Sequence, residues 1–214
     1  MRRFVTAVTL AIGLAPAAAR AEGSEPPARR DWAFALYLDG IVHEDSTGTL
    51  VPTVFADRNA LHLEARYNYE DVRTASLWAG YAFTFGDEAT YLRATPMGGA
   101  VVGQTHGVAP GLEVDGRWSR FTYWLEAEYV FDFADSTENN LYIWSELDLR
   151  LVRWLWSGAA AQRLKYLGSP RDLQVGPAVG FGKADTTPGW SLTFYAFGLA
   201  REAPWYQGTL AVLF

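Results

Sequence analysis

Acidic residues recur at every second position in two stretches of this chain, and their spacing suits acid–base chemistry or ion binding. Glu126 and Glu128 lie in SRFTYWLEAEYVFDF, and Glu146 and Asp148 lie in NLYIWSELDLRL. A hairpin turn centred on residue 136 would set Glu126 opposite Glu146 and Trp124 opposite Asp148. Neighbouring carboxylates repel each other, so one of them takes up a proton or a cation lies between them.

Histidine and serine could supply a nucleophile and its base, and His62, Glu64 and Ser76 point to the same side of two neighbouring predicted strands. A turn near Val72 separates His62 from Ser76 by about 20 Å along the strand. A nucleophile and its base must lie about 3 Å apart. The sequence therefore predicts no catalytic site. It also predicts no metal site and no cofactor, because histidine does not recur among oxygen ligands at a fixed spacing.

The elements that carry these residues are predicted to be β-strands, because apolar and polar residues alternate with a period of two. In NALHLEARYNYED, for example, Leu61, Leu63 and Ala65 alternate with His62 and Glu64. The segments are also longer than the 5 or 6 residues typical of soluble sheets, and they match the roughly 9 to 11 residues of a tilted membrane strand. Candidate strands lie at 32–42, 59–70, 74–86, 89–97, 99–115, 118–132, 139–151, 154–165, 171–183, 188–200 and 204–214.

Alternation alone allows two interpretations, since the charged rows could face water around a soluble β-sandwich or face the lumen of a barrel. The length of the segments favours the lumen, and so does the apolar strand that ends the chain. A third argument is that aromatic residues gather near the ends of the apolar rows, as in membrane-interface girdles. These residues are Tyr67, Tyr69, Phe83, Phe85, Tyr129 and Phe131.

The N-terminal segment has the layout of a secretory signal peptide, residues 1–21. Arg2 and Arg3 precede an apolar run of about 13 residues, and small residues surround a predicted cleavage site after Ala21. Residues 22–31, which include EGSEPPARR, are expected to form a flexible periplasmic leader. The predicted domain then occupies residues 32–214. The absence of cysteine excludes disulfides and lipid attachment through a cysteine.

The last residues, YQGTLAVLF, form an alternating apolar row that stops at a phenylalanine. Together with the signal peptide and the alternating strands, this row resembles bacterial outer-membrane β-barrel proteins of Gram-negative cells. The resemblance covers the whole mature chain, but only at the level of architecture. It implies that the last strand is read by the barrel-assembly machinery. The residues of this predicted assembly signal are Tyr206, Gly208, Leu210, Val212 and Phe214.

The predicted fold is all-β, a closed antiparallel up-and-down transmembrane barrel of 10 or 12 strands. The candidate strands number eleven, whereas single-chain bacterial barrels have even numbers. Either GTLVPTVFADR supplies a twelfth strand, or the glycine-rich segment ATPMGGAVVGQTHGVAPG holds only one. Connections such as EDVR and GDE are short, which favours a meander.

Charges inside such a barrel must be paired or hydrated. The inward rows nearly balance acids and bases, so the sequence predicts a salt-bridged plug, with a weak cation-accepting pore as the alternative. Trp78 and Trp144 are also expected to narrow the lumen. The predicted polar cluster consists of Glu64, Arg66, Trp124, Glu126, Glu128, Tyr142, Glu146, Asp148, Arg150 and Arg163.

Composition narrows the possible functions further. Removing the signal peptide leaves 15 basic against 24 acidic residues, so the basic patch suited to nucleic acid is absent. We expect a structural barrel or a passive small-solute pore in the outer membrane, with lipid and the assembly machinery as partners. The alternative is an outer-membrane enzyme or ligand carrier whose site contains Arg66, Glu126, Tyr142 and Glu146. No motif indicates the solute or ligand.

Overall fold

A computed structural model describes residues 31–43, 48–87, 89–166, 172–183, 187–199 and 203–214 of this chain. The predicted signal peptide, and all of the predicted leader except Asp31, lie outside the described residues. Within the described residues, no helix has the length and apolar character needed to cross a bilayer.

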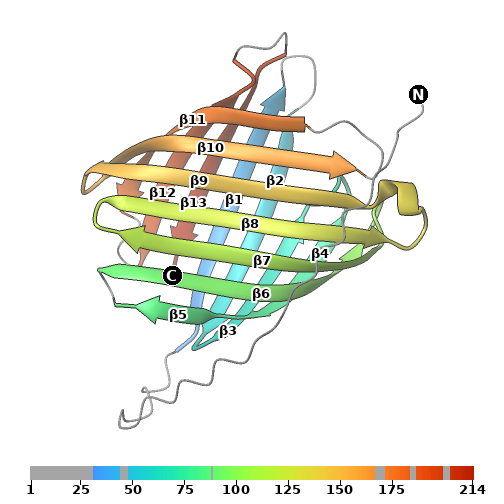
Figure 1. Cartoon of the computed structure of the whole chain (residues 1–214), viewed down its shortest axis with the longest axis horizontal. Coiled ribbons are helices and arrows are strands. Elements are labelled where there is room, and N and C mark those ends of the chain that lie inside the picture. The colour runs from blue at the N-terminus through green and yellow to red at the C-terminus, as the bar shows by residue number, and fades with distance from the viewer. Residues whose placement is uncertain (1–30, 44–47, 88, 167–171, 184–186, 200–202) are drawn as a thin grey trace.

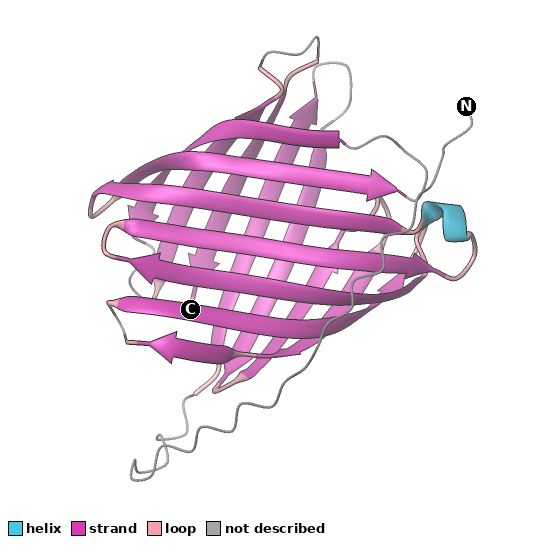
Figure 2. Cartoon of the chain, viewed as in Figure 1, coloured by secondary structure: helices cyan, strands magenta, loops and turns pink. Residues whose placement is uncertain are grey.

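One antiparallel sheet makes up nearly all of the structure and closes on itself as a barrel (Figures 1 and 2). The β6–β10 strands lie across the front of Figure 1, and β1–β3, β12 and β13 run behind them. The strands are β1 (Ala33–His43), β2 (Thr49–Arg58), β3 (Leu61–Tyr67), β4 (Ala75–Tyr81), β5 (Phe83–Gly86), β6 (Thr90–Val102), β7 (Gly107–Trp118), β8 (Phe121–Asp132), β9 (Asn140–Val152), β10 (Leu155–Tyr166), β11 (Asp172–Lys183), β12 (Gly189–Phe197) and β13 (Trp205–Leu213).

The barrel has 12 strands, because β4 and β5 are two parts of one strand interrupted at Ala82. The β4 part pairs with both β3 and β6, and β5 continues the pairing with β6. Each strand otherwise pairs with its neighbours along the chain, and β1 pairs with β13 to close the circle. Phe34 and Phe214 exchange backbone hydrogen bonds of 2.9 and 3.0 Å beside this pairing. The predicted closed up-and-down barrel is confirmed.

The strand count resolves in favour of 12, since GTLVPTVFADR supplies β2. The predicted boundaries at 89–97 and 99–115 were wrong. The β6 strand continues through Pro96 and the Gly98–Gly99 pair, and the chain leaves the ladder only at Gly103, whose φ is +148°. Glycine adopts this conformation without steric cost. Gly99 also leaves room for the Trp78 indole, which a β-carbon at this position would overlap.

Burial along the strands is inverted relative to a soluble protein. In β3, His62, Glu64 and Arg66 are buried. In β4, Trp78 is 2 % exposed, whereas the neighbouring Leu77 is 68 % exposed. The row that carries charges therefore faces the lumen, and the apolar row faces outward. A soluble sandwich would bury its apolar row instead.

Two-residue turns gather at the end of the barrel where β1 begins and β13 ends. They connect β2 to β3, β7 to β8 and β9 to β10. Asn59 and Ser119 open two of these turns with φ values of 56°, and such left-handed residues match the twist of a tight hairpin. At the opposite end, the connections 68–74 and 133–139 are longer, and the second contains the short 3-10 helix η1 (Ser136–Glu138).

Candidate functional site

Arg66 lies at the centre of a charged network that crosses the lumen. Its Nε donates to Glu64 Oε2 at 2.6 Å, and its Nη1 donates to Glu126 Oε1 at 2.7 Å and to Glu128 Oε2 at 3.0 Å. Arg66 belongs to β3 and the two glutamates belong to β8, which is not a neighbour of β3 in the sheet. These bonds therefore join opposite parts of the barrel wall. We call Glu64, Arg66, Glu126 and Glu128 the Arg66 network.

Residues after β3 extend the network toward the end of the barrel that carries the longer connections. The Tyr69 hydroxyl donates to Glu126 Oε2 at 2.6 Å, and the guanidinium of Arg66 lies over the Tyr69 ring at 4.4 Å. Burial raises the pKa of the Tyr69 hydroxyl well above its usual range, and the Glu126 carboxylate adds to this increase. The Trp78 indole donates to Glu70 at 3.1 Å, and Ser76 donates to the same carboxylate oxygen.

A second group of contacts lies toward the tight-turn end and is centred on His62. Its Nδ1 lies 2.9 Å from Asp57 Oδ1, and its Nε2 lies 2.6 Å from Glu64 Oε1. Glu113 of β7 approaches the same Nε2, with its Oε2 at 3.3 Å. Arg93 of β6 binds Asp57 at 2.5 Å. We call His62, Glu64 and Glu113 the histidine group.

Aromatic side chains gather on the lumenal side of β9, β12 and β13. Trp144, Tyr195, Phe197 and Trp205 form one buried cluster, in which the Phe197 and Trp205 rings stack with centroids 4.3 Å apart. The Tyr195 hydroxyl donates to Glu146 Oε2 at 2.9 Å. The lumen therefore holds a charged network on one side and an aromatic cluster on the other.

The predicted register between β8 and β9 was wrong by two residues. Glu126 lies opposite Trp144, and Trp124 lies opposite Glu146. The turn is centred on Asp135 rather than on residue 136, and moving the centre by one residue moves every cross-strand partner by two. The Asp135 carboxylate accepts from the hydroxyl and amide of Thr137, which lowers the pKa of that carboxyl.

The structure separates the predicted polar cluster into parts. The Arg66 network brings together four of its members. Glu146 and Asp148 are also buried but lie apart with Tyr195, while Trp124 and Tyr142 are half-buried beside the aromatic cluster. Arg150 lies on the inward row, opposite Trp156.

Arg163 does not belong to the lumenal cluster in the structure. It pairs with Ile143 and Leu173, and directly opposite residues share a face of the sheet. Leu173 is exposed on the outer surface. The alternation pattern assigned Arg163 to the wrong face of the sheet. Its own strand, LWSGAAAQRLKY, shows only weak alternation of apolar and polar residues.

The near balance of inward charges was also wrong. The register places Lys165 with Leu141 on the outward row, and Arg120 lies in a turn, where it donates to backbone carbonyls. The inward basic residues of the described strands are Arg66, Arg93, Arg117 and Arg150, together with the histidines His43 and His62. The inward acids outnumber them, and include Asp39, Asp57, Glu64, Glu113, Asp115, Glu126, Glu128, Glu146 and Asp148.

Sequence reasoning missed the contacts of several residues that the structure places in the networks. Glu113 and Asp115 lay inside a candidate strand with misplaced bounds, so their face was not assigned. His62 was correctly placed on the row of Glu64 and Arg66, and that shared row was the signal available for its contacts. The predicted distance from Ser76 was too long, because Ser76 pairs with Arg66, four residues or about 13 Å along β3 from His62. The two residues still do not contact each other: Ser76 bonds with Glu70 and Trp78, whereas His62 bonds with Asp57 and Glu64.

Comparison with known proteins supports the fold. No protein-family model and no curated protein matches this sequence. A solved structure of the KdgM porin is similar at a TM-score of 0.56 and 10% identity, covering 83% of this chain and 98% of that one. The KdgM porin in complex with disordered oligogalacturonate gives 0.55 and 9%, with the same coverage. Omp33, an outer membrane protein of Acinetobacter baumannii, gives 0.47 and 11%, covering 87% and 99%.

At these identities the likeness is one of fold. The resemblance drawn from the alternating strands and the C-terminal row is confirmed at that level. This chain has the closed 12-strand antiparallel fold of bacterial outer-membrane β-barrels.

Proposed function

We propose that this chain is an outer-membrane barrel that forms a narrow passive pore, largely closed by its own side chains. The outward row supports the membrane location, because large apolar side chains such as Leu77, Tyr81 and Val175 are more than half exposed in the isolated chain. An exposed apolar band of this kind needs lipid around it.

The two ends of the barrel support an orientation in that membrane. Outer-membrane barrels have short periplasmic turns and longer extracellular loops. The end with the two-residue turns and both termini of the barrel would then face the periplasm, consistent with export by the predicted signal peptide. The apolar row of β13, with Tyr206 and Phe214 about half exposed, would be presented to the barrel-assembly machinery as the strand inserts.

The observation that carries the proposed closure is the set of bonds between strands that do not neighbour each other. Three such contacts join separate parts of the barrel wall: Arg66 with Glu126, His62 with Glu113, and Asp57 with Arg93. Such bonds occupy the lumen itself. A solute can pass only beside them, so the path is narrow.

The charge of the lumen favours small cations and uncharged solutes over anions. Inward carboxylates exceed inward arginines, and a cleft lined by one sign of charge concentrates the opposite ion. The KdgM porin, which is similar in fold, has been solved in complex with disordered oligogalacturonate. The acidic lumen of this chain would oppose a polyanion of that kind.

Single-channel recording on refolded protein in planar bilayers tests the proposal. The wild type is expected to give a small conductance, with a reversal potential in a salt gradient that indicates cation preference. Replacing Arg66 and Glu126 together by alanine removes the cross-lumen bond without changing the net charge. The conductance should rise severalfold, because both long side chains leave the lumen.

A substitution on the tight-turn end provides the matched control. Arg153 is exposed between β9 and β10, so Arg153→Ala should leave conductance unchanged. The proposal is contradicted if the wild type prefers anions, or if the double variant conducts no more than the wild type.

A further inference from the structure

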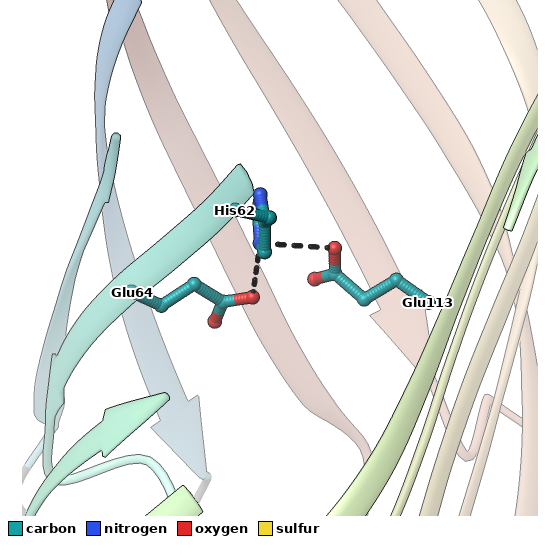
Figure 3. Close-up of side chains that lie close together, drawn as sticks. All are labelled: His62, Glu64 and Glu113. Carbon is teal, nitrogen blue, oxygen red and sulfur yellow. Dashed lines mark hydrogen bonds and ion pairs between the residues drawn. The ribbon is translucent and has the colours of Figure 1, made fainter. Parts of the chain in front are cut away.

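The histidine group presents three ligand atoms to one point in the lumen. His62 Nε2, one Glu64 oxygen and one Glu113 oxygen all lie within 4.8 Å of one another. Figure 3 shows the Glu64 and Glu113 carboxylates directed at the imidazole from β3 and from β7. All three residues are at most 3 % exposed. One imidazole nitrogen with carboxylate oxygens is a donor set that suits zinc and its neighbours in the first transition row.

The partners behind these ligand atoms are those of a metal site. A ligating histidine usually donates its other ring N–H to a carboxylate, which fixes the tautomer and frees the second nitrogen for the metal. Here Asp57 Oδ1 lies 2.9 Å from His62 Nδ1. Arg66 Nε donates to Glu64 Oε2, which orients that carboxylate and leaves its Oε1 toward the imidazole.

Glu113 supplies an independent observation. Its Oε1 is buried and has no hydrogen-bond partner in the structure. A buried carboxylate oxygen without a hydrogen-bond donor has lost its hydration without a replacement hydrogen bond, which destabilises the folded state. The histidine group has two carboxylates against one imidazole, and inward carboxylates are in excess across the described strands. A cation bound at the Glu113 carboxylate would balance this charge, and it would also satisfy Oε1 when the carboxylate binds through both of its oxygens.

We propose that His62, Glu64 and Glu113 bind one divalent transition metal ion, with Zn²⁺ as the best match. Bond lengths of about 2.0–2.2 Å in a tetrahedral site place ligand atoms about 3.3–3.6 Å apart. The Nε2 to Glu113 Oε2 distance of 3.3 Å already fits. The Nε2 to Glu64 Oε1 distance of 2.6 Å opens by less than about 1 Å when a metal replaces the shared proton.

The sequence predicted no metal site because β3 supplies only two candidate ligands, His62 and Glu64. The third ligand comes from β7, on another part of the wall. Access to the group runs beside Asp57, whose side chain is 31 % exposed, and Arg93, whose side chain is 26 % exposed. The inference does not depend on the proposed function, since a barrel that conducts nothing could bind the metal equally well.

Metal titration of the refolded, chelator-treated protein in detergent tests the proposal. Co²⁺ serves as the probe, because its visible absorption reports the ligand geometry, and Zn²⁺ is then added to displace it. One equivalent of Co²⁺ is expected to bind, and affinity should fall as pH falls, because protons compete for the imidazole and carboxylates. Glu113→Gln and His62→Gln should each weaken binding at least about tenfold, since even residues behind the ligands change affinity by that factor.

Glu146→Gln is the matched control, because it removes a buried carboxylate from outside the histidine group and should leave Co²⁺ affinity unchanged. Circular dichroism and heat-dependent gel mobility show whether each variant folds. Glu113→Gln keeps the shape of the side chain, so it remains informative if a His62 variant fails to fold. The proposal is overturned if wild type and Glu113→Gln bind Co²⁺ equally, or if Glu146→Gln weakens binding as much as Glu113→Gln does. In either case the group is a proton-bridged network rather than a metal site.

Discussion

At the scale of single residues, Arg66 holds the charged side of the lumen together. Its guanidinium contacts carboxylates on two strands and also lies over the rings of Tyr69 and Trp78, at 4.4 and 4.7 Å. A planar guanidinium can make these contacts at once because its donors lie in one plane and its faces remain free for aromatic rings. A lysine at this position could not replace both kinds of contact.

Replacing Arg66 by glutamine should strongly destabilise the barrel. The change leaves Glu64, Glu126 and Glu128 buried without their cation, and breaking a buried ion pair from one side costs about 3–5 kcal/mol. Equilibrium unfolding in urea, from lipid vesicles, measures this loss. Arg153→Gln, in an exposed turn, should change the free energy of unfolding by no more than about 0.5 kcal/mol. Equal effects of the two variants would show that the Arg66 network does not stabilise the fold.

At the scale of elements, alternation predicted the strands with the clearest pattern. The β3, β8 and β9 strands lie close to their predicted bounds, because each shows a full row of apolar residues against a polar one. The bounds of the β6–β7 hairpin were predicted wrongly because glycine and proline do not indicate which face of the sheet a position occupies. Gly98, Gly99 and Pro96 interrupt the pattern within a continuous strand.

The candidate site was predicted only in part, for a geometric reason. Alternation indicates which face a side chain occupies, so the inward positions of Glu64, Arg66, Glu126 and Glu128 were found from sequence. It does not indicate which residues meet across the lumen, because that depends on strand number and stagger around the whole barrel. The contact between His62 and Glu113 could not be derived for the same reason.

The β6 strand offers a paired test of packing inside the lumen. A β-carbon at Gly99 would overlap the Trp78 indole, whereas one at Gly98 would meet no atom within 4 Å. Gly99→Ala should therefore destabilise the barrel by about 1–3 kcal/mol through overpacking, and Gly98→Ala should have little effect. Urea unfolding followed by tryptophan fluorescence measures both. A Gly99→Ala variant as stable as Gly98→Ala would mean that Trp78 moves freely, contrary to its buried position.

At the scale of the whole molecule, the barrel places its charges inside and its apolar residues outside. The end of the chain belongs to this scale, because β13 both completes the apolar outer surface and closes the circle with β1. The Phe214 ring also stacks with Phe34, with centroids 6.1 Å apart.

Phe214→Ala separates a role in assembly from a role in stability. The variant keeps the backbone bonds to Phe34, so refolding in detergent should give nearly the wild-type yield. In cells, the amount of folded barrel in the outer membrane should fall severalfold, because the terminal aromatic of the predicted assembly signal is lost. Phe131→Ala removes another outward phenylalanine and should not lower the amount in cells. Similar amounts for both variants would contradict the assembly role.

The bonds of Arg66 have a consequence for the order in which the barrel can form. All of its carboxylate partners lie between β3 and β8. Half of the sheet can thus curl and pair Arg66 with these carboxylates while the seam between the first and last strands is still open. An intermediate that inserts into the membrane therefore need not expose Arg66 and its carboxylate partners to hydrocarbon before the first and last strands pair.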